Sequence, residues 1–315
     1  MIEPVAREKI TPRGVEEISE TLRRASVDGL AVRIEGGNTL AGMGFPLDRC
    51  DITIGLRELN ALIAHEVHDL TCALSAGMTL RDVDRALETN AQFVPLDAPQ
   101  RSRATVGGTM ASGWRGPRRH LYGSPRELLL GIDTVLADGT PVRAGGMVVK
   151  NVAGYDMGKL YTGSFGAPGV ITRANFKTLP SPQLTRAVVA RLPERTRARA
   201  VAHLYALSVP PAAALLIEGF RNAITGEDGI DGRLFVLLQG SPNVVDRATR
   251  DLRSALGKAG VPEASIVEDG AFTAFTQILD ATVECVGERS ATYRIFALPA
   301  EAESRAANLR DIAVR

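Results

Sequence analysis

The chain has 315 residues, of which 45% are hydrophobic and 23% charged, a composition typical of a globular protein with room for two domains. Its formal net charge of +1 argues against nucleic-acid binding, because no excess of positive charge attracts phosphate backbones. Its three cysteines form no C-x-x-C pair, which argues against zinc and iron–sulfur sites and favours a cytoplasmic location. No apolar run approaches the roughly 20 residues that span a bilayer, and no signal peptide is expected.

The first 180 residues predict helices and strands that alternate with glycine-rich segments. A helix is expected from Thr11, as its cap, to about Val27, because apolar residues recur there at helical spacing. The following strand, residues 30–34, leads directly into Gly36-Gly37-Asn38-Thr39. Further strands are expected at residues 51–54, 69–74, 128–136, 142–144 and 170–178, a helix at 79–87, and a hairpin turn at Asp138-Gly139.

A change in character around Pro180-Ser181-Pro182 marks the expected domain boundary, since two prolines interrupt regular structure there. Beyond it the order is strand, helix, strand, strand, helix, strand, a βαββαβ succession similar to a ferredoxin-like layer. The fold class is therefore α+β. The elements are expected at residues 185–192, 194–208, 214–218, 233–239, 242–259 and 264–267.

Three glycine-rich segments are the most informative feature of the chain: residues 36–39, 104–109 and 163–171. Backbone without side chains can bring N–H groups within hydrogen-bonding distance of a bulky anionic ligand. The alternative for residues 36–39 is a tight turn between two strands. The common nucleotide motifs do not apply, since residues 42–47 lack the third glycine of a dinucleotide fingerprint and residues 154–160 miss the P-loop spacing.

The order of these segments resembles the FAD-binding domain of the vanillyl-alcohol oxidase/p-cresol methylhydroxylase (PCMH) superfamily, within it most of all the E subunits of bacterial glycolate oxidases. The resemblance covers about residues 4 to 180, and it also rests on residues 116–119, 122–124 and 150–156. It implies a two-subdomain PCMH-type FAD-binding domain at residues 1–180. A ferredoxin-like cap domain with a truncated C-terminal closure would follow at residues 181–315.

The resemblance also implies which residues bind the cofactor. Arg118 and Arg119 would counter the charge of the phosphates or of a reduced flavin, the alternative being an exposed basic turn. Tyr155 and Asp156 are interpreted as a structural cap for their loop rather than as contacts to the ring. The residues expected to bind FAD are Gly36, Gly37, Asn38, Thr39, Thr105, Gly107, Gly108, Thr109, Ser112, Arg118, Gly169, Val170 and Ile171.

The chain departs from the family pattern at informative places. Asn38 stands where members with covalent flavin carry histidine, so noncovalent FAD is expected. Gly166-Ala167-Pro168-Gly169 replaces Gly-Thr-Leu-Gly and has one backbone donor fewer. His203 is the only histidine of the second domain, so no metal site is expected. Residues 293–299 are not followed by the motifs with which family members close over the flavin. A partner is therefore expected to cover the flavin ring, or the ring is more exposed.

Three functions remain open. The first is an FAD-binding subunit of a glycolate oxidase-like complex that relays electrons between flavin and an iron–sulfur partner. A second flavin protein, resembling the D subunits of glycolate oxidases, would bind the 2-hydroxy acid, and the complex would reach a membrane only through its partners. The second is a self-sufficient 2-hydroxy acid dehydrogenase with Tyr155, Tyr293 or His120 as base. The third is a structural or regulatory subunit whose flavin pocket is degenerate.

Overall fold

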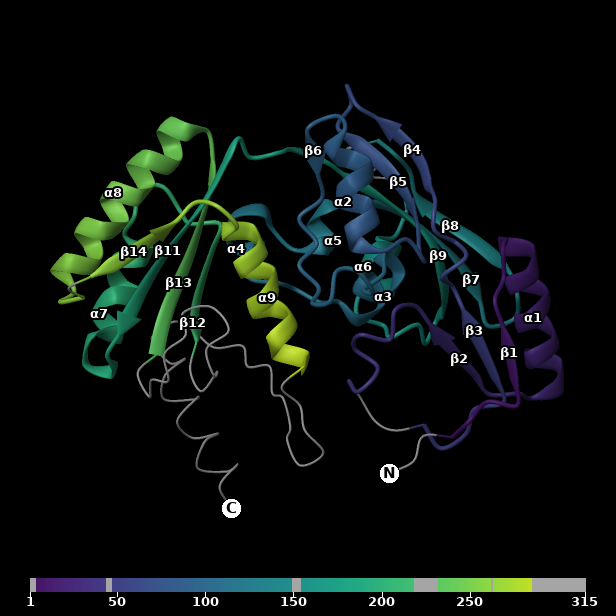
Figure 1. Cartoon of the computed structure of the whole chain (residues 1–315). Coiled ribbons are helices and arrows are strands. Elements are labelled where there is room, and N and C mark those ends of the chain that lie inside the picture. The colour runs from purple at the N-terminus through teal and green to yellow at the C-terminus, as the bar shows by residue number, and fades with distance from the viewer. Residues whose placement is uncertain (1–3, 44–46, 149–153, 218–231, 262, 285–315) are drawn as a thin grey trace, which may run out of the picture. The chain divides into compact units, whose positions relative to one another are not determined.

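A computed structural model describes residues 4–43, 47–148, 154–217, 232–261 and 263–284 of the chain (Figure 1). The chain divides into two compact units, Met1–Ser181 and Pro182–Arg315, and each unit has a hydrophobic core of its own. Among the described residues, no helix is both long and apolar enough to cross a membrane.

The first unit begins with a small parallel sheet. Its order is β1 (Glu8–Ile10), β3 (Ile52–Gly55), β2 (Val32–Glu35). Helix α1 (Val15–Asp28) joins β1 to β2 and buries Ile18, Leu22 and Ala25, residues spaced so that they share one face. Gly14 and not Thr11 occupies its N-cap position. Strand β2 therefore delivers the chain to the segment Gly36–Thr39 at the end of this sheet.

A five-stranded antiparallel sheet forms the rest of the first unit's framework. Its order is β4 (Leu62–Glu66), β5 (Thr71–Ser75), β9 (Gly169–Lys177), β7 (Leu129–Leu136), β8 (Pro141–Gly145). The predicted hairpin at Asp138-Gly139 is confirmed: Gly139 has φ 83° and the turn joins β7 to β8. Helix α2 (Leu80–Glu88) follows β5 and is capped by the Thr79 hydroxyl. A two-stranded ribbon pairs β6 (Gln92–Phe93) with β10 (Leu179–Pro180).

The remaining helices of the first unit are short. The segment around Gly107 and Gly108, expected as a loop, contains helix α3 (Val106–Ser112), because the Thr105 side chain accepts from the Gly108 N–H and caps it. The others are α4 (Arg119–Tyr122), α5 (Pro125–Leu128) and α6 (Met157–Tyr161).

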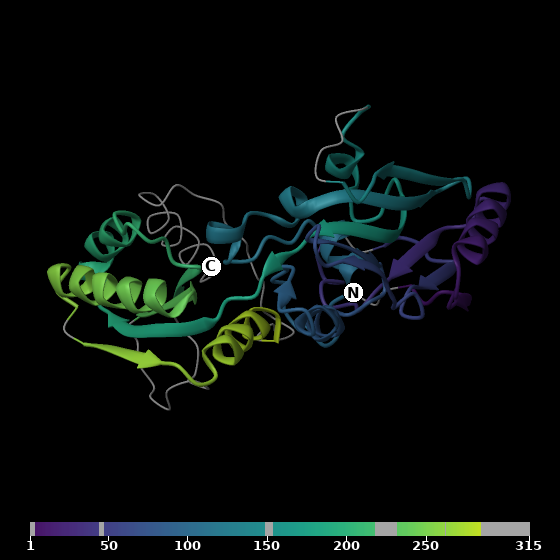
Figure 2. The same cartoon turned by 90° about the horizontal axis from the view of Figure 1, so that it is seen from above.

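The second unit contains one antiparallel sheet and three helices among its described residues. The elements in chain order are β11 (Leu184–Leu192), α7 (Glu194–Tyr205), β12 (Ala213–Ile217), β13 (Gly232–Gly240), α8 (Pro242–Lys258), β14 (Ala264–Val267) and α9 (Ala271–Glu284). The strand order is β12-β13-β11-β14. Apolar residues of β11 and β13 pack with α7 and α8 (Figures 1 and 2), whereas α9, which the sequence did not predict, contacts β11 and β13.

Candidate functional site

The first two glycine-rich segments contact each other directly. A Cβ atom on Gly36 would lie 2.3 Å from the Thr105 hydroxyl oxygen, and a Cβ on Gly37 would lie 1.8 Å from the backbone oxygen of Arg103. Any side chain at either position would therefore collide with residues 103–105. The glycines let the end of β2 and the start of α3 come together, although these segments are almost 70 residues apart in the chain.

Asn38 and Glu35 fix the conformation of the first segment. Asn38 has φ 55°, a left-handed backbone that asparagine accepts more readily than most residues, and its side chain hydrogen-bonds to Glu35. The Glu35 carboxylate is buried and also pairs with Arg33 and, at 3.4 Å, with Lys9. Burial raises the pKa of Glu35, but Arg33, Asn38 and Lys9 together outweigh it and hold the pKa below its ordinary value.

The amides of the first segment are not used by the rest of the fold. Within the described part of the chain, the backbone N–H groups of Gly37, Asn38 and Thr39 have no acceptor. Two exposed arginines stand beside them: Arg103 donates to the Gly37 carbonyl at 3.4 Å, and Arg57 donates to the Arg103 carbonyl at 3.5 Å. Neither arginine belongs to the residues expected from the sequence, and only the position of Arg103 next to the second glycine-rich segment would have pointed to it.

The second segment differs, because its polar groups are used inside the protein. The Gly107 N–H donates to the Ala76 carbonyl at 2.7 Å, and the Thr109 hydroxyl donates to the Thr105 carbonyl at 2.8 Å. The Ser112 hydroxyl donates to the Thr109 carbonyl at 3.2 Å. A Cβ on Gly107 would lie 2.8 Å from the Ala76 Cβ, so this glycine is required by packing against the turn after β5.

The third segment contacts the last residues of α3 and Ile34 of β2, which lie next to the other two segments. The Gly163 N–H donates to the Met110 carbonyl at 2.9 Å, and the Phe165 N–H donates to the Ala111 carbonyl at 2.8 Å. A Cβ on Gly166 would lie 3.2 Å from the side chain of Ile34 in β2. Residues 34–39, 103–113 and 163–166 therefore meet at one place. Gly169, Val170 and Ile171 follow as the first residues of β9, and their side chains or Cα atoms are buried against β7.

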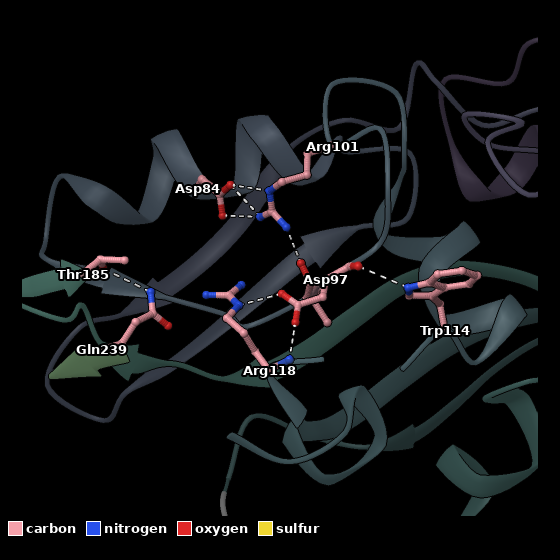
Figure 3. A network of polar contacts seen from close by, with 8 residues as sticks. Asp84, Asp97, Arg101, Trp114, Arg118, Thr185 and Gln239 are labelled. Atoms are coloured by element: carbon pink, nitrogen blue, oxygen red, sulfur yellow. Dashed lines mark hydrogen bonds and ion pairs between the residues drawn. The ribbon is translucent and has the colours of Figure 1, made fainter. Parts of the chain in front are cut away.

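Arg118 occupies a different environment from the exposed basic turn that was one of the two expectations. Its side chain is 2% exposed and donates to the Asp97 carboxylate at 2.7 Å, while its backbone N–H donates to the same carboxylate at 2.9 Å (Figure 3). The guanidinium also lies over the rings of Phe93 and Tyr122, at 5.6 and 5.9 Å. For Arg118 the exposed-turn alternative is wrong, because Asp97, 21 residues earlier, neutralises it inside the fold.

Figure 3 shows that the Asp97 region is linked on two further sides. The Trp114 indole N–H donates to the Asp97 carbonyl at 3.1 Å, and Arg101 forms a bidentate ion pair with Asp84 while donating to the Leu96 carbonyl. These contacts fasten the chain between β6 and α4, and with it the end of α3.

The remaining candidates lie apart from this cluster of contacts or outside the described residues. Tyr155 is 95% exposed, and the Asp156 carboxylate pairs with Arg126 instead of capping α6. His203 lies half-buried in the last turn of α7. Tyr293 and residues 150–153 are outside the described residues. In the second unit, a hollow of about 340 Å³ is lined by Arg186, Asp246, Thr249, Arg250, Arg253 and Ile266, none of which belongs to the expected site.

Comparisons with known proteins identify a cofactor-binding domain in the first unit. Residues 7–159 match the family described as FAD binding domain. Over 169 residues the chain is 34% identical to glycolate oxidase subunit GlcE of Escherichia coli (strain K12), a match that covers 53% of this chain and 48% of that protein. The structure matches p-cresol methylhydroxylase with a TM-score of 0.64 at 16% identity, covering 86% of this chain and 61% of that one. Residues 7–159 therefore match an FAD binding domain, and the likeness to p-cresol methylhydroxylase, at 16% identity, shows the fold alone.

The match to the FAD binding domain gives the cofactor as FAD, and the structural likeness agrees with the mixed helix and sheet content. A second relative, glycolate oxidase subunit GlcD of Bacillus subtilis (strain 168), is 30% identical over 211 residues, 66% of this chain and 45% of that protein. The matches thus span about half the length of these two relatives.

Proposed function

We propose that this protein is a member of the PCMH-type family, an FAD-dependent oxidoreductase that works as one component of a glycolate oxidase-like complex on a 2-hydroxy acid. The names of its relatives support the proposal, since two of them are subunits of glycolate oxidases. A second flavin protein would bind the substrate, and an iron–sulfur protein would accept the electrons. A cytoplasmic location, with any membrane contact made through the partners, stays a prediction.

The FAD would lie where the three glycine-rich segments meet. The observation that supports this placement best is the contact of Gly36 and Gly37 with residues 103–105, which leaves the N–H groups of Gly37, Asn38 and Thr39 unused. Adjacent unused amides with guanidinium groups close by suit a pyrophosphate, so the residues present fit this cofactor. The residues proposed to form the site are Gly36, Gly37, Asn38, Thr39, Thr105, Gly107, Gly108, Thr109, Ser112, Arg118, Gly169, Val170 and Ile171.

The roles within this set are unequal. Gly37, Asn38 and Thr39 would donate backbone hydrogen bonds, whereas Gly107, Thr109 and Ser112 would shape the site, because their polar groups already have partners in α3 and the turn before it. Arg118 would act through the loop that it anchors to Asp97. Arg57 and Arg103 join the set as exposed cations that lower the cost of bringing phosphates together.

When bound, FAD would supply a carrier for the electrons that the oxidation of the hydroxy acid releases. The attachment would be noncovalent: Asn38 offers no nucleophile for a flavin, and its side chain is bound to Glu35. Proton abstraction needs a base held within reach of the substrate. Tyr155 is almost fully exposed and unsuited to hold a substrate by itself, whereas His120, also exposed, and Tyr293, outside the described residues, leave the self-sufficient dehydrogenase as the alternative.

For the second unit we infer a ferredoxin-like cap domain. The element order βαββαβ, the antiparallel sheet order β12-β13-β11-β14 and the two helices on one face support it. Helix α9 is an addition to that arrangement. The proposed boundary between the domains, after residue 180, agrees with the division into compact units after Ser181.

Two measurements on the purified chain test the proposal. An absorption spectrum before and after addition of FAD should show a bound flavin, and acid precipitation should release it into the supernatant. A chain that stays colourless in excess FAD would support the degenerate pocket instead. Dye-coupled turnover with glycolate or D-lactate should require the partner proteins, so activity of the chain by itself would favour the self-sufficient dehydrogenase.

A further inference from the structure

Phe165 is a large aromatic residue in a position that the fold does not favour. It lies between α6 and β9 with φ 54°, a left-handed backbone in which a bulky side chain is strained and glycine is not. Its side chain is 57% exposed, so burial of the ring offsets little of that strain. Folding alone would be served better by glycine at this position, which points to a contact made by the ring outside the folded chain.

The backbone of Phe165 is bound to α3, and the next residue lies beside β2. Its N–H donates to the carbonyl of Ala111 at 2.8 Å, near the end of α3, whose cap Thr105 touches Gly36. One residue later, Gly166 adjoins the Ile34 side chain in β2, two positions before Gly36. The ring is thus carried by a loop that is held firmly against the place where the three glycine-rich segments meet.

We propose that the Phe165 ring stacks on one of the two aromatic ring systems of FAD, the adenine or the isoalloxazine. This inference rests on the proposed function, and it adds a residue that the family resemblance did not supply. Aromatic side chains bind planar rings through stacking, and phenylalanine has only two side-chain torsions to immobilise. A strained but fixed backbone presents such a ring in advance, which lowers the entropic cost of binding.

Equilibrium binding of FAD to the cofactor-free chain, followed by flavin fluorescence, tests the role of the ring. Phe165→Ala should weaken FAD binding about tenfold, the size of one lost stacking contact. Phe165→Trp keeps a stacking surface and should bind within about twofold of the unchanged chain. Ile63→Ala is the matched control: Ile63 is 46% exposed in β4 and has no part in the proposed site, so its affinity should not change.

A second readout separates the ring's role from loop structure. Phe165→Gly should raise the melting temperature of the cofactor-free chain, because it relieves the left-handed strain, and at the same time weaken FAD binding. A residue that only supports the loop would not change stability and affinity in opposite directions. Equal losses in Phe165→Trp and Phe165→Ala would likewise overturn the proposal.

Competition with ADP and FMN identifies the ring that is contacted. Loss of ADP affinity in Phe165→Ala with FMN unaffected assigns the contact to adenine, and the reverse assigns it to the isoalloxazine. If the unchanged chain binds FAD and Phe165→Ala binds it equally well, the inference is wrong and the proposed function stands. If the unchanged chain binds no FAD, the proposed function fails, and the inference fails with it.

Discussion

Glu35 is the residue on which the conformation of the first glycine-rich segment depends most. Its buried carboxylate joins Lys9 of β1, Arg33 of β2 and the side chain of Asn38. Without that carboxylate, Asn38 would lose its side-chain partner and Arg33 its closest counter-charge. The amides proposed to bind the pyrophosphate would then be held less rigidly.

Replacing this carboxylate should therefore have a pH-dependent effect. The pKa of Glu35 is lowered in the fold, so the ionised group stabilises it fully above the ordinary carboxyl pKa, and this stabilisation is lost as the pH falls through the lower folded value. Glu35→Gln should be less stable than the unchanged chain at neutral pH, and the two should converge as the pH falls below the ordinary carboxyl pKa and through the lower folded value. Urea unfolding from neutral to acid pH measures this, and a difference independent of pH would rule out the charge as its cause.

The buried pair of Asp97 and Arg118 should be far more sensitive than any exposed pair. Asp97→Asn keeps the shape of the side chain but leaves the Arg118 guanidinium, 2% exposed, without its carboxylate. We expect a loss of about 3–5 kcal/mol in the free energy of unfolding, because an uncompensated charge would be buried. Urea unfolding at neutral pH checks the value.

The control for that prediction is Asp133→Asn, which breaks the ion pair to the 70% exposed Arg143 in the β7–β8 hairpin. Solvent screens such a pair, so its removal should cost no more than about 1 kcal/mol. Adding Arg118→Met to Asp97→Asn should recover part of the loss, since the buried charge is then gone. Equal costs at the two sites would contradict the burial of Arg118.

At the scale of elements, the contact between the first two glycine-rich segments can be tested with a single methyl group. Gly37→Ala would place its Cβ 1.8 Å from the Arg103 carbonyl oxygen, so one of the two segments must move. We expect a loss of about 1–3 kcal/mol of stability, typical of overpacking, and at least tenfold weaker FAD binding. Gly42→Ala has no atom within 4 Å of its added Cβ and should alter neither quantity. Thermal unfolding and FAD titration of both variants give the comparison.

How far a helix or strand could be predicted depends on whether a regular apolar face or a contact between residues far apart in the chain stabilises it. The strands and helices that bury a regular apolar face, such as α8 and β13, were predicted to within a few residues, because periodicity carries that information. Helix α3 was expected as a loop: two glycines disfavour a helix locally, and the contact of Gly107 with Ala76, 31 positions earlier, cannot be recognised from the sequence.

The same distinction applies to the candidate site. The glycines at positions 36, 37 and 107 were predicted from their pattern as residues that bind a ligand. The structure adds a second reason for them, because each glycine lets two segments of the protein pack closely together. The burial of Arg118 depends on Asp97, and the place of Arg57 depends on Arg103, contacts between residues far apart in the chain. Family resemblance named the loops, whereas only the structure separates the residues with unused donors from those whose donors are already bonded.

At the scale of the whole molecule, the two units have separate cores and unequal shares of the site. The core of the first unit extends from Ile18 to Phe176, and that of the second includes residues from Val188 to Val261. Every residue proposed to contact FAD, including Phe165, belongs to the first unit. FAD binding by the first unit should therefore be measurable without the second unit.

A fragment that ends at Ser181 should fold and bind FAD without the second unit. It keeps the β6–β10 ribbon and the bond from the Ser181 N–H to the Ala91 carbonyl, so the cut removes no strand from the first unit. We expect its affinity for FAD to lie within about tenfold of the full chain, because every proposed contact is retained. Flavin fluorescence titration and thermal unfolding of the fragment measure both properties. A folded fragment that binds no FAD would mean that the second unit supplies contacts which the three glycine-rich segments do not, and Gly37→Ala in the full chain would then weaken binding only slightly.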